Sequence, residues 1–227
     1  MQAELFWARV AQLVRGGPVA GLVTVAKRLL RPWLELGTIV VFELPLRRCT
    51  LAPRARSLEV RLLQAGDVPR VAAAFGRRPE ALAGRLARGD RGYCAFSDDE
   101  PLHMRWVTTR PTHIPEVGLW LRPAAGTVYV YDVETRAAAR GRGLAGLARA
   151  AMDDSLAAEG FHAKVAYIRG DNHAMWRSVS DAPGPLRRLC RVGYVRRRGQ
   201  APRILGRPRW PLTAVPPPPS RSTSAIV

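Results

Sequence analysis

Lysine is nearly absent from this chain of 227 residues, in which Lys27 and Lys164 are the only two. Acidic residues are also few, since 18 aspartates and glutamates stand against 36 lysines and arginines. Arginine therefore supplies nearly all of a formal net charge of +18. A charge excess of this size favours an anionic partner, such as a phosphorylated cofactor, an anionic lipid surface or nucleic acid.

Cysteine and histidine are sparse as well. The three cysteines, Cys49, Cys94 and Cys190, are widely spaced and form no CxxC pair, which argues against a disulfide framework and fits a reducing compartment. The four histidines show no HExxH or HxxxH spacing, so we predict no structural metal. The chain also lacks an apolar run of the ~20 residues that span a bilayer and the pattern of a secretory signal. We therefore expect a cytoplasmic protein.

The apolar pattern divides the chain into three parts. Residues 1–50 carry leucine and valine at helical spacing among basic residues, with Trp7 and Trp33 at either side, and predict a basic amphipathic helical arm followed by a linker. Residues 51–210 predict one domain with a sizeable core. Residues 211–227 include four consecutive prolines and predict a disordered tail.

Two interpretations of the helical arm stay open. In the first, the arm packs on the main domain or on the second copy of a homodimer. In the second, it attaches to an anionic membrane surface, because basic residues and interfacial tryptophans together favour such lipid. The protein would then be peripheral at the inner membrane surface.

The main domain predicts short strands alternating with helices. The expected helices cover residues 67–75, 79–88, 143–158 and 174–179. The expected strands of this domain cover residues 58–63, 93–96, 102–108, 117–121, 127–135, 163–168 and 193–195, and a further strand is expected at residues 38–44, before the linker. This order predicts an α/β fold with a mixed, mostly antiparallel central sheet flanked by helices.

The most specific chemical signal is the loop Arg140-Gly141-Arg142-Gly143-Leu144-Ala145-Gly146, which lies between a predicted strand and an alanine-rich helix. Unpaired N–H groups at the start of a helix, together with the positive end of its dipole, bind a diphosphate. Glycine lets the anion approach the backbone closely, and the two arginines add charge at the rim. The pattern therefore predicts a pyrophosphate-binding loop.

The same loop also matches the dinucleotide fingerprint GxGxxG through Gly141, Gly143 and Gly146. That fingerprint normally follows the first strand of a domain directly, and an acidic residue ends the next strand. Here the glycines come late in the chain, the polar segment 134–139 precedes them, and the next strand ends in Arg169. These differences argue against a dinucleotide.

Arg140 to Ala145 matches the motif R/Q-x-x-G-x-G/A, and in this it resembles the acyl-CoA signature of the GNAT superfamily. The similarity covers about residues 57–200, because further segments follow in the family's order: the hairpin 92–107, the strands 131–136 and 163–168, the segment Asp171-Asn172-His173-Ala174 and the pair Gly193-Tyr194. The resemblance implies a GNAT-like fold. It also implies an N-acyltransferase that moves an acyl group, acetyl in the first place, from acetyl-CoA or a longer acyl-CoA to a small-molecule or peptide amine.

The resemblance also implies roles for individual residues. In the family, the fourth and fifth strands splay apart, and the pantetheine lies between them like an added strand. Carried over, Val133 and Thr135 offer backbone groups to the pantetheine, and Arg140 to Gly146 hold the pyrophosphate. Asn172 lies near the thiol end.

Direct acyl transfer needs a base that takes a proton from the attacking ammonium. Asp132 and Glu134 alternate onto one face of their strand and are the candidate catalytic bases, with Glu134 favoured because it is nearer the loop. Glu116 is a weaker third candidate. Alternatively, each acid merely pairs with a neighbouring arginine.

One position departs from the family, which often has a tyrosine four residues before the Gly-Phe pair as an acid for the departing thiolate. This chain has Leu189 there. Either the thiolate leaves unassisted, or Cys190, Tyr167 or Tyr194 replaces the tyrosine.

Two other functions stay open. The chain is a non-catalytic acyl-CoA binder, or it is a basic module that binds nucleic acid or an anionic surface. For the second, residues 186–209 contain nine arginines and no acid, which suits contacts with phosphates. The segment lacks the interleaved aromatic residues of a single-strand groove, which makes a nucleic-acid partner the less favoured one.

Overall fold

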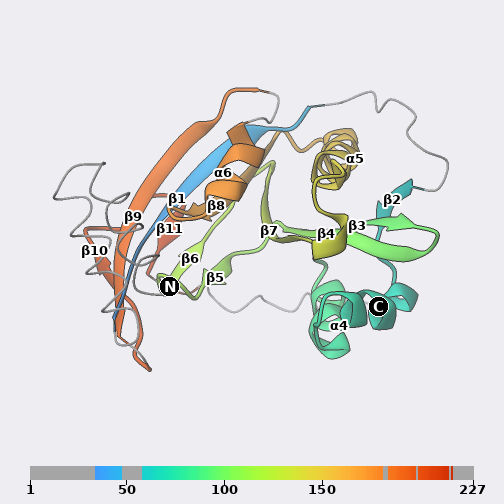
Figure 1. The fold of residues 1–227 in the computed structure, drawn as a ribbon. Coiled ribbons are helices and arrows are strands. Elements are labelled where there is room, and N and C mark those ends of the chain that lie inside the picture. The colour runs from blue at the N-terminus through green and yellow to red at the C-terminus, as the bar shows by residue number, and fades with distance from the viewer. Residues whose placement is uncertain (1–33, 48–57, 181–183, 198, 215, 217–227) are drawn as a thin grey trace, which may run out of the picture.

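A computed structural model describes residues 34–47, 58–180, 184–197, 199–214 and 216 (Figure 1). The predicted helices of the arm and the predicted disordered tail after residue 216 lie outside the described residues. The helices are η1 (Ala65–Asp67), α3 (Val68–Ala74), α4 (Pro79–Ala87), η2 (Ala137–Ala139), α5 (Leu144–Ala158) and α6 (His173–Ser180). The strands are β1 (Leu34–Pro45), β2 (Leu58–Leu62), β3 (Arg91–Ser97), β4 (Glu100–Thr108), β5 (Thr112–Ile114), β6 (Leu119–Leu121), β7 (Thr127–Thr135), β8 (Ala163–Arg169), β9 (Arg187–Arg197), β10 (Arg203–Leu205) and β11 (Leu212–Thr213).

The main sheet contains eight strands in the order β10-β9-β1-β8-β7-β4-β3-β2. Its neighbouring strands are antiparallel, except that β7 and β8 are parallel. A second sheet has the order β11-β6-β5. The predicted α/β fold, with a mixed and mostly antiparallel sheet flanked by helices, is confirmed.

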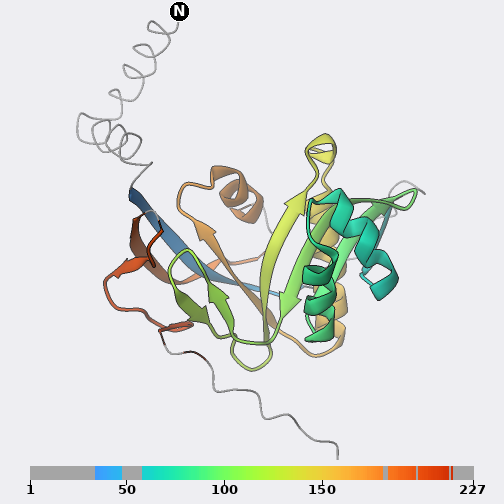
Figure 2. The same ribbon diagram turned by 90° about the horizontal axis from the view of Figure 1, so that it is seen from below.

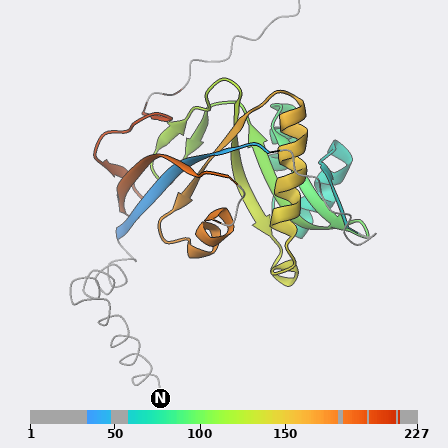
Figure 3. The same cartoon turned by 90° about the horizontal axis from the view of Figure 1, so that it is seen from above.

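The main sheet is covered on both faces. Helices α3 and α4 and the second sheet lie on one face (Figure 2), and α5 and α6 lie on the other (Figure 3). On the first face, Val71 of α3 and Leu82 of α4 pack with Trp106 of β4. On the second face, Met152 of α5 packs with Val128 of β7. Within the described part of the chain, no helix has the length and apolar character needed to cross a membrane.

Strand β1 lies in the middle of one half of the sheet, paired with β8 on one side and β9 on the other. Its run Ile39-Val40-Val41-Phe42 is buried throughout, as expected for a strand whose two faces are both covered. The predicted division at residue 50 is therefore corrected, because residues 34–45 belong to the sheet and not to an arm. The division at residue 210 is corrected too, because β11 at 212–213 pairs with β6.

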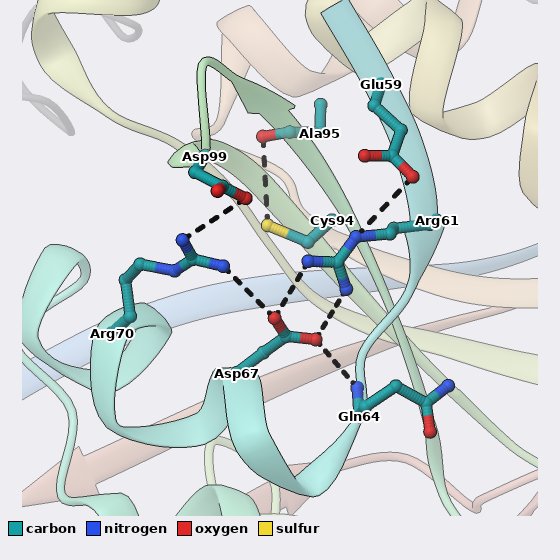
Figure 4. A network of polar contacts seen from close by, with 8 residues as sticks. All are labelled: Glu59, Arg61, Gln64, Asp67, Arg70, Cys94, Ala95 and Asp99. Atoms are coloured by element: carbon teal, nitrogen blue, oxygen red, sulfur yellow. Dashed lines mark hydrogen bonds and ion pairs between the residues drawn. The ribbon is translucent and has the colours of Figure 1, made fainter.

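Asp67 holds β2, α3 and the β3–β4 turn together (Figure 4). Its carboxylate is buried and accepts hydrogen bonds from Arg61 Nη2 (2.8 Å) and from the Gln64 amide (3.0 Å). Arg70 Nη2 also contacts it at 3.2 Å, while Arg70 Nη1 lies 3.3 Å from Asp99. The hydrogen bond from Arg61 is the main reason why the pKa of Asp67 falls to about 2. Asp67 thus stabilises the fold as an anion.

Asp67→Asn should destabilise the fold by about 2 kcal/mol at neutral pH, because a carboxylate with a folded pKa near 2 and an unfolded pKa near 4 contributes that much. This contribution is complete above pH 4 and is lost as the pH falls through 2. Chemical denaturation of parent and variant between pH 2 and pH 7 measures it. Asp99→Asn is the matched control, since its side chain is 78% exposed and an exposed ion pair is worth at most ~1 kcal/mol. Equal losses in both variants would contradict the role of Asp67.

Candidate functional site

Strands β7 and β8 separate after a short parallel contact. Their pairing extends from Thr127 and Ala163 to Tyr129 and Val165 and then ends. Beyond this point β7 continues to Thr135 beside β4, and β8 continues to Arg169 beside β1, so the two strands diverge (Figure 2). The divergence leaves one edge of β7 without a neighbouring strand over the residues predicted to face a pantetheine, Val133 and Thr135.

The loop from Arg140 to Gly146 follows β7 and the short helix η2 and leads into α5. Arg140 is extended, whereas Gly141 and Gly143 have left-handed φ values of 78° and 75°, which favour glycine. Arg140 to Gly143 are exposed, and Leu144 is buried against Leu102 and Ala139. Leu144 therefore anchors the first turn of α5 while the polar part of the loop faces solvent.

Gly146 has no structural reason to be glycine. It lies in the first turn of α5, and a Cβ added there would meet no atom within 4 Å. Glycine inside a helix costs about 0.5–1 kcal/mol relative to alanine. Open space above a helix N-terminus, with a glycine that neither packing nor backbone requires, fits close approach by an anion such as a diphosphate. The residues at this site therefore fit the phosphate part of an acyl-CoA.

A diverging parallel strand pair within a mostly antiparallel sheet, followed by this loop and helix, is the arrangement that the sequence resemblance implies. The chain has the mixed, mostly antiparallel α/β fold that the sequence predicts. No protein-family model and no curated protein matches its sequence, so the comparison with known proteins concerns structure alone.

Three solved structures illustrate the similarity. A functionally unknown conserved protein from Staphylococcus epidermidis has a TM-score of 0.52 and 7% identity, over 76% of this chain and 65% of its own. A GCN5-related N-acetyltransferase from Sphaerobacter thermophilus has a TM-score of 0.47 and 18% identity, over 77% of this chain and 56% of its own. One from Kribbella flavida has a TM-score of 0.44 and 15% identity, over 74% of this chain and 62% of its own. The chain thus spans less than two thirds of each, and identities this low concern the fold alone.

Asn172 lies at the start of α6, directly after β8. Its Oδ1 accepts a hydrogen bond from the Met175 amide at 3.1 Å, which is the geometry of a helix N-cap. Asn172 therefore lies just beyond the end of β8, the strand that diverges from β7. A contact with the thiol of a cofactor stays a prediction.

The two predicted bases lie at a bulge in β7. Tyr131 pairs with Trp106 and Glu134 with Met104, so Asp132 and Val133 together face one residue of β4. Asp132 has a φ of 46°, which is uncommon outside glycine but tolerated by aspartate. A bulge interrupts the two-residue alternation from which a shared face was predicted.

Despite the bulge, Asp132 and Glu134 reach the same cation. Arg77 Nη2 donates to Asp132 Oδ1 (3.1 Å) and to Glu134 Oε2 (2.7 Å), and Arg85 Nη1 donates to Asp132 Oδ2 (2.6 Å). This is the alternative of arginine pairing that the sequence left open. Proton transfer to either carboxylate must compete with these bonds, and for Asp132 it must compete with two guanidinium groups.

Glu116 has a different environment. It lies in the turn between β5 and β6, and its Oε2 accepts a hydrogen bond of 3.0 Å from the Tyr167 hydroxyl. No arginine or lysine of the described chain lies within 4.0 Å of its carboxylate. Tyr167 is on β8, two residues beyond the last pair with β7. Among the described residues, Glu116 is therefore a carboxylate beside the diverging strands that forms no ion pair.

The three candidate acids lie at different places. Tyr167 is next to the divergence, and burial raises its pKa well above the usual range. Tyr194 is buried and its hydroxyl donates to Glu35 (3.0 Å), while burial raises its pKa to about 12. Cys190 and Leu189 lie on β9, which β1 separates from β8. Of the three, the structure thus brings Tyr167 alone to the diverging pair.

Several residues near the loop were not foreseen from the sequence. Arg77 and Arg85 pair with the predicted bases, and His103 and Arg105 lie buried in β4 behind the loop. The sequence did contain a signal for His103 and Arg105, because two polar residues two positions apart in an apolar strand point to one face. In a chain so rich in arginine, no local pattern indicates that Arg77 and Arg85 are the arginines that contact the predicted bases.

Proposed function

We propose that this protein is an acyl-CoA-dependent N-acyltransferase that moves an acyl group, acetyl in the first place, to an amine. The observation that carries the proposal is the position of the loop from Arg140 to Gly146. It lies at the N-terminus of α5, and the short helix η2 joins it to β7, the strand that diverges from its neighbour. The anion site at the helix N-terminus matches the diphosphate of an acyl-CoA. The open edge of β7, which precedes it along the chain, matches the pantetheine of the same ligand.

In this proposal the chain itself mainly binds and orients. The exposed loop holds the diphosphate, and Val133 and Thr135 offer main-chain groups along the open edge of β7. When bound, acyl-CoA supplies a thioester carbon for attack by the amine. Holding the two reactants in position accounts for much of the rate gain in such a direct transfer.

The proposed base is a carboxylate beside the diverging strands. Glu134 is the first candidate, because it is near the loop and shares one arginine with Asp132 rather than holding two. Asp132 is the second. Glu116, which touches Tyr167 and has no cation within ion-pair distance in the described chain, is the third.

Gly146→Ala should stabilise the free protein and weaken acyl-CoA binding at the same time. The free protein gains about 0.5–1 kcal/mol from better helix propensity, which raises the melting temperature by roughly 1–4 °C at this size. The added methyl group enters the space proposed for the diphosphate, and we expect binding to weaken about tenfold. Thermal shifts with acetyl-CoA and longer acyl-CoAs measure both effects and show which acyl chain stabilises most.

Gly84→Ala is the matched control for this variant. Gly84 also lies within a helix, and its Cβ would make an ordinary contact at 3.6 Å with Arg88. It should stabilise the protein without changing the shift caused by acetyl-CoA. If Gly146→Ala binds acetyl-CoA as tightly as Gly84→Ala does, the proposed position of the diphosphate is wrong.

A further inference from the structure

Arg105 is a buried arginine directly behind the proposed anion loop. Its side chain leaves β4 on the face covered by α5 and is 6% exposed. Its Nη2 donates a hydrogen bond of 3.0 Å to the Ala145 carbonyl, in the first turn of α5. Burial lowers its pKa to about 10, so the guanidinium still carries its charge at neutral pH.

In the part of the chain that the structure describes, the charge of Arg105 has no direct counter-ion. Within the described residues, no carboxylate lies within 4.0 Å of its guanidinium, and its Nε is 3.4 Å from His103 Nε2. The pKa of His103 falls to about 3, mainly through burial, so this histidine is neutral. Burying a cation without a paired anion is costly, and the ligand-free fold therefore carries an unbalanced positive charge at this place.

The nearest acid is already occupied. Asp153 of α5 is buried and forms an ion pair with the equally buried Lys164 of β8. Asp153 interacts with Arg105 only at longer range, and Arg149 of α5 adds a further positive charge to the same region. Arg105, Arg149 and Lys164 therefore outnumber the single acid Asp153 in this region. The excess positive charge lies behind the N-terminal turn of α5.

We propose that Arg105 is a positioning residue for the diphosphate of the ligand, and that the bound diphosphate supplies the missing counter-charge. This inference rests on the proposed function, since acyl-CoA brings the diphosphate. Arg105 holds the first turn of α5 in place through its hydrogen bond to the Ala145 carbonyl. Its positive charge also attracts the diphosphate from the other side of this turn. In a poorly solvated position such a charge is screened much less by salt than a charge in solvent.

A second contact connects Arg105 to β7 through His103. Since His103 Nε2 accepts from Arg105, His103 Nδ1 carries the proton and donates to Thr135 Oγ1, 2.7 Å away. Arg105 therefore links the first turn of α5 to Thr135 on β7. The backbone of Thr135, which the proposal assigns to the pantetheine, is also held by its pairing with His103 in the sheet, so the loss of Arg105 falls on the diphosphate and not on the pantetheine.

The test compares ligands that carry or lack the diphosphate. In Arg105→Met, the affinity for CoA and for ADP should fall about tenfold or more, whereas the affinity for pantetheine, measured by NMR titration, should stay within twofold of the parent. The melting temperature of the free variant should not fall, because removing an unpaired buried charge relieves a cost. Arg105→Lys keeps the charge and should recover part of the affinity for ADP.

Salt separates Arg105 from the arginines at the rim of the loop. The loss in Arg105→Met should persist at 0.5 M salt, where the loss in Arg142→Met, at an exposed position, should largely disappear. Arg91→Met, which removes a surface arginine paired with Glu159, is the control and should change neither affinity.

Several results would overturn the inference. Equal losses of ADP and pantetheine affinity, or a large fall in the stability of free Arg105→Met and of a second variant, Arg105→Gln, would show a purely structural role. Unchanged affinity for ADP would show no role at all. If the parent binds CoA in these cases, the proposed function survives. If the parent binds neither CoA nor ADP, the proposed function fails as well.

Discussion

Gly143→Glu should leave the protein folded and reduce its affinity for acetyl-CoA at least ~100-fold. Gly143 is the exposed N-cap of α5 with a φ of 75°, so the substitution places a carboxylate among the amides proposed to hold the diphosphate. Two like charges ~4 Å apart near a protein surface repel by about 4 kcal/mol, which corresponds to roughly a thousandfold in Kd. Loss of the thermal shift with acetyl-CoA, confirmed by calorimetric titration, measures the effect.

Gly160→Glu separates this effect from backbone strain. Gly160 follows α5 at its other end and has a φ of 89°, and a Cβ added there would meet no atom within 4 Å. The substitution therefore brings the same charge and a similar strain of about 1–2 kcal/mol, but far along the helix from the loop. It should keep the affinity of the parent. A folded Gly143→Glu protein with parental affinity would refute the loop as the diphosphate site.

Glu134→Gln should reduce turnover ~10²–10⁴-fold, the usual contribution of a general base, while acetyl-CoA affinity stays unchanged. The amide keeps the shape of the side chain and removes proton acceptance, so the loss falls on the rate and not on cofactor binding. Release of free thiol from acetyl-CoA, with a panel of primary amines, gives the rate. Glu159→Gln, at the far end of α5, is the matched control and should keep parental turnover.

The other two carboxylates make this test decisive. Asp132→Asn disrupts contacts with Arg77 and Arg85, so it should lower stability more than Glu134→Gln does. If both variants keep near-parental turnover, Glu134 and Asp132 are ion-pair partners only. Glu116→Gln should then show the large loss, and Tyr167→Phe, which removes the hydrogen bond to Glu116, should show a smaller one.

Local patterns in the sequence predict much of the fold. The β3–β4 hairpin follows from two apolar segments around Ser97-Asp98-Asp99-Glu100, and α5 follows from an alanine-rich run after glycines. Short strands were missed, namely β5, β10 and β11, because two or three residues carry no periodicity. Their pairing depends on neighbours that lie far away in the chain.

The candidate site was predictable in position but not in its interactions. Glycine and arginine spacing located the loop, yet nothing local indicated the bulge at Asp132, which contains neither glycine nor proline. The arginine that contacts Glu134 is 57 residues away. With 36 basic residues for 18 acids, many pairings satisfy the charges equally well, and only the packing of α3 and α4 on the sheet decides among them.

The position of β1 also determines when the protein can fold during its synthesis. Both partners of β1, β8 and β9, are translated more than a hundred residues later, so this half of the sheet closes only after β9, which ends at Arg197, has left the ribosome. Contacts of such long sequence separation slow folding. Until they form, the apolar strand Ile39-Val40-Val41-Phe42 is an unpaired, aggregation-prone segment that the nascent chain must keep apart from other strands.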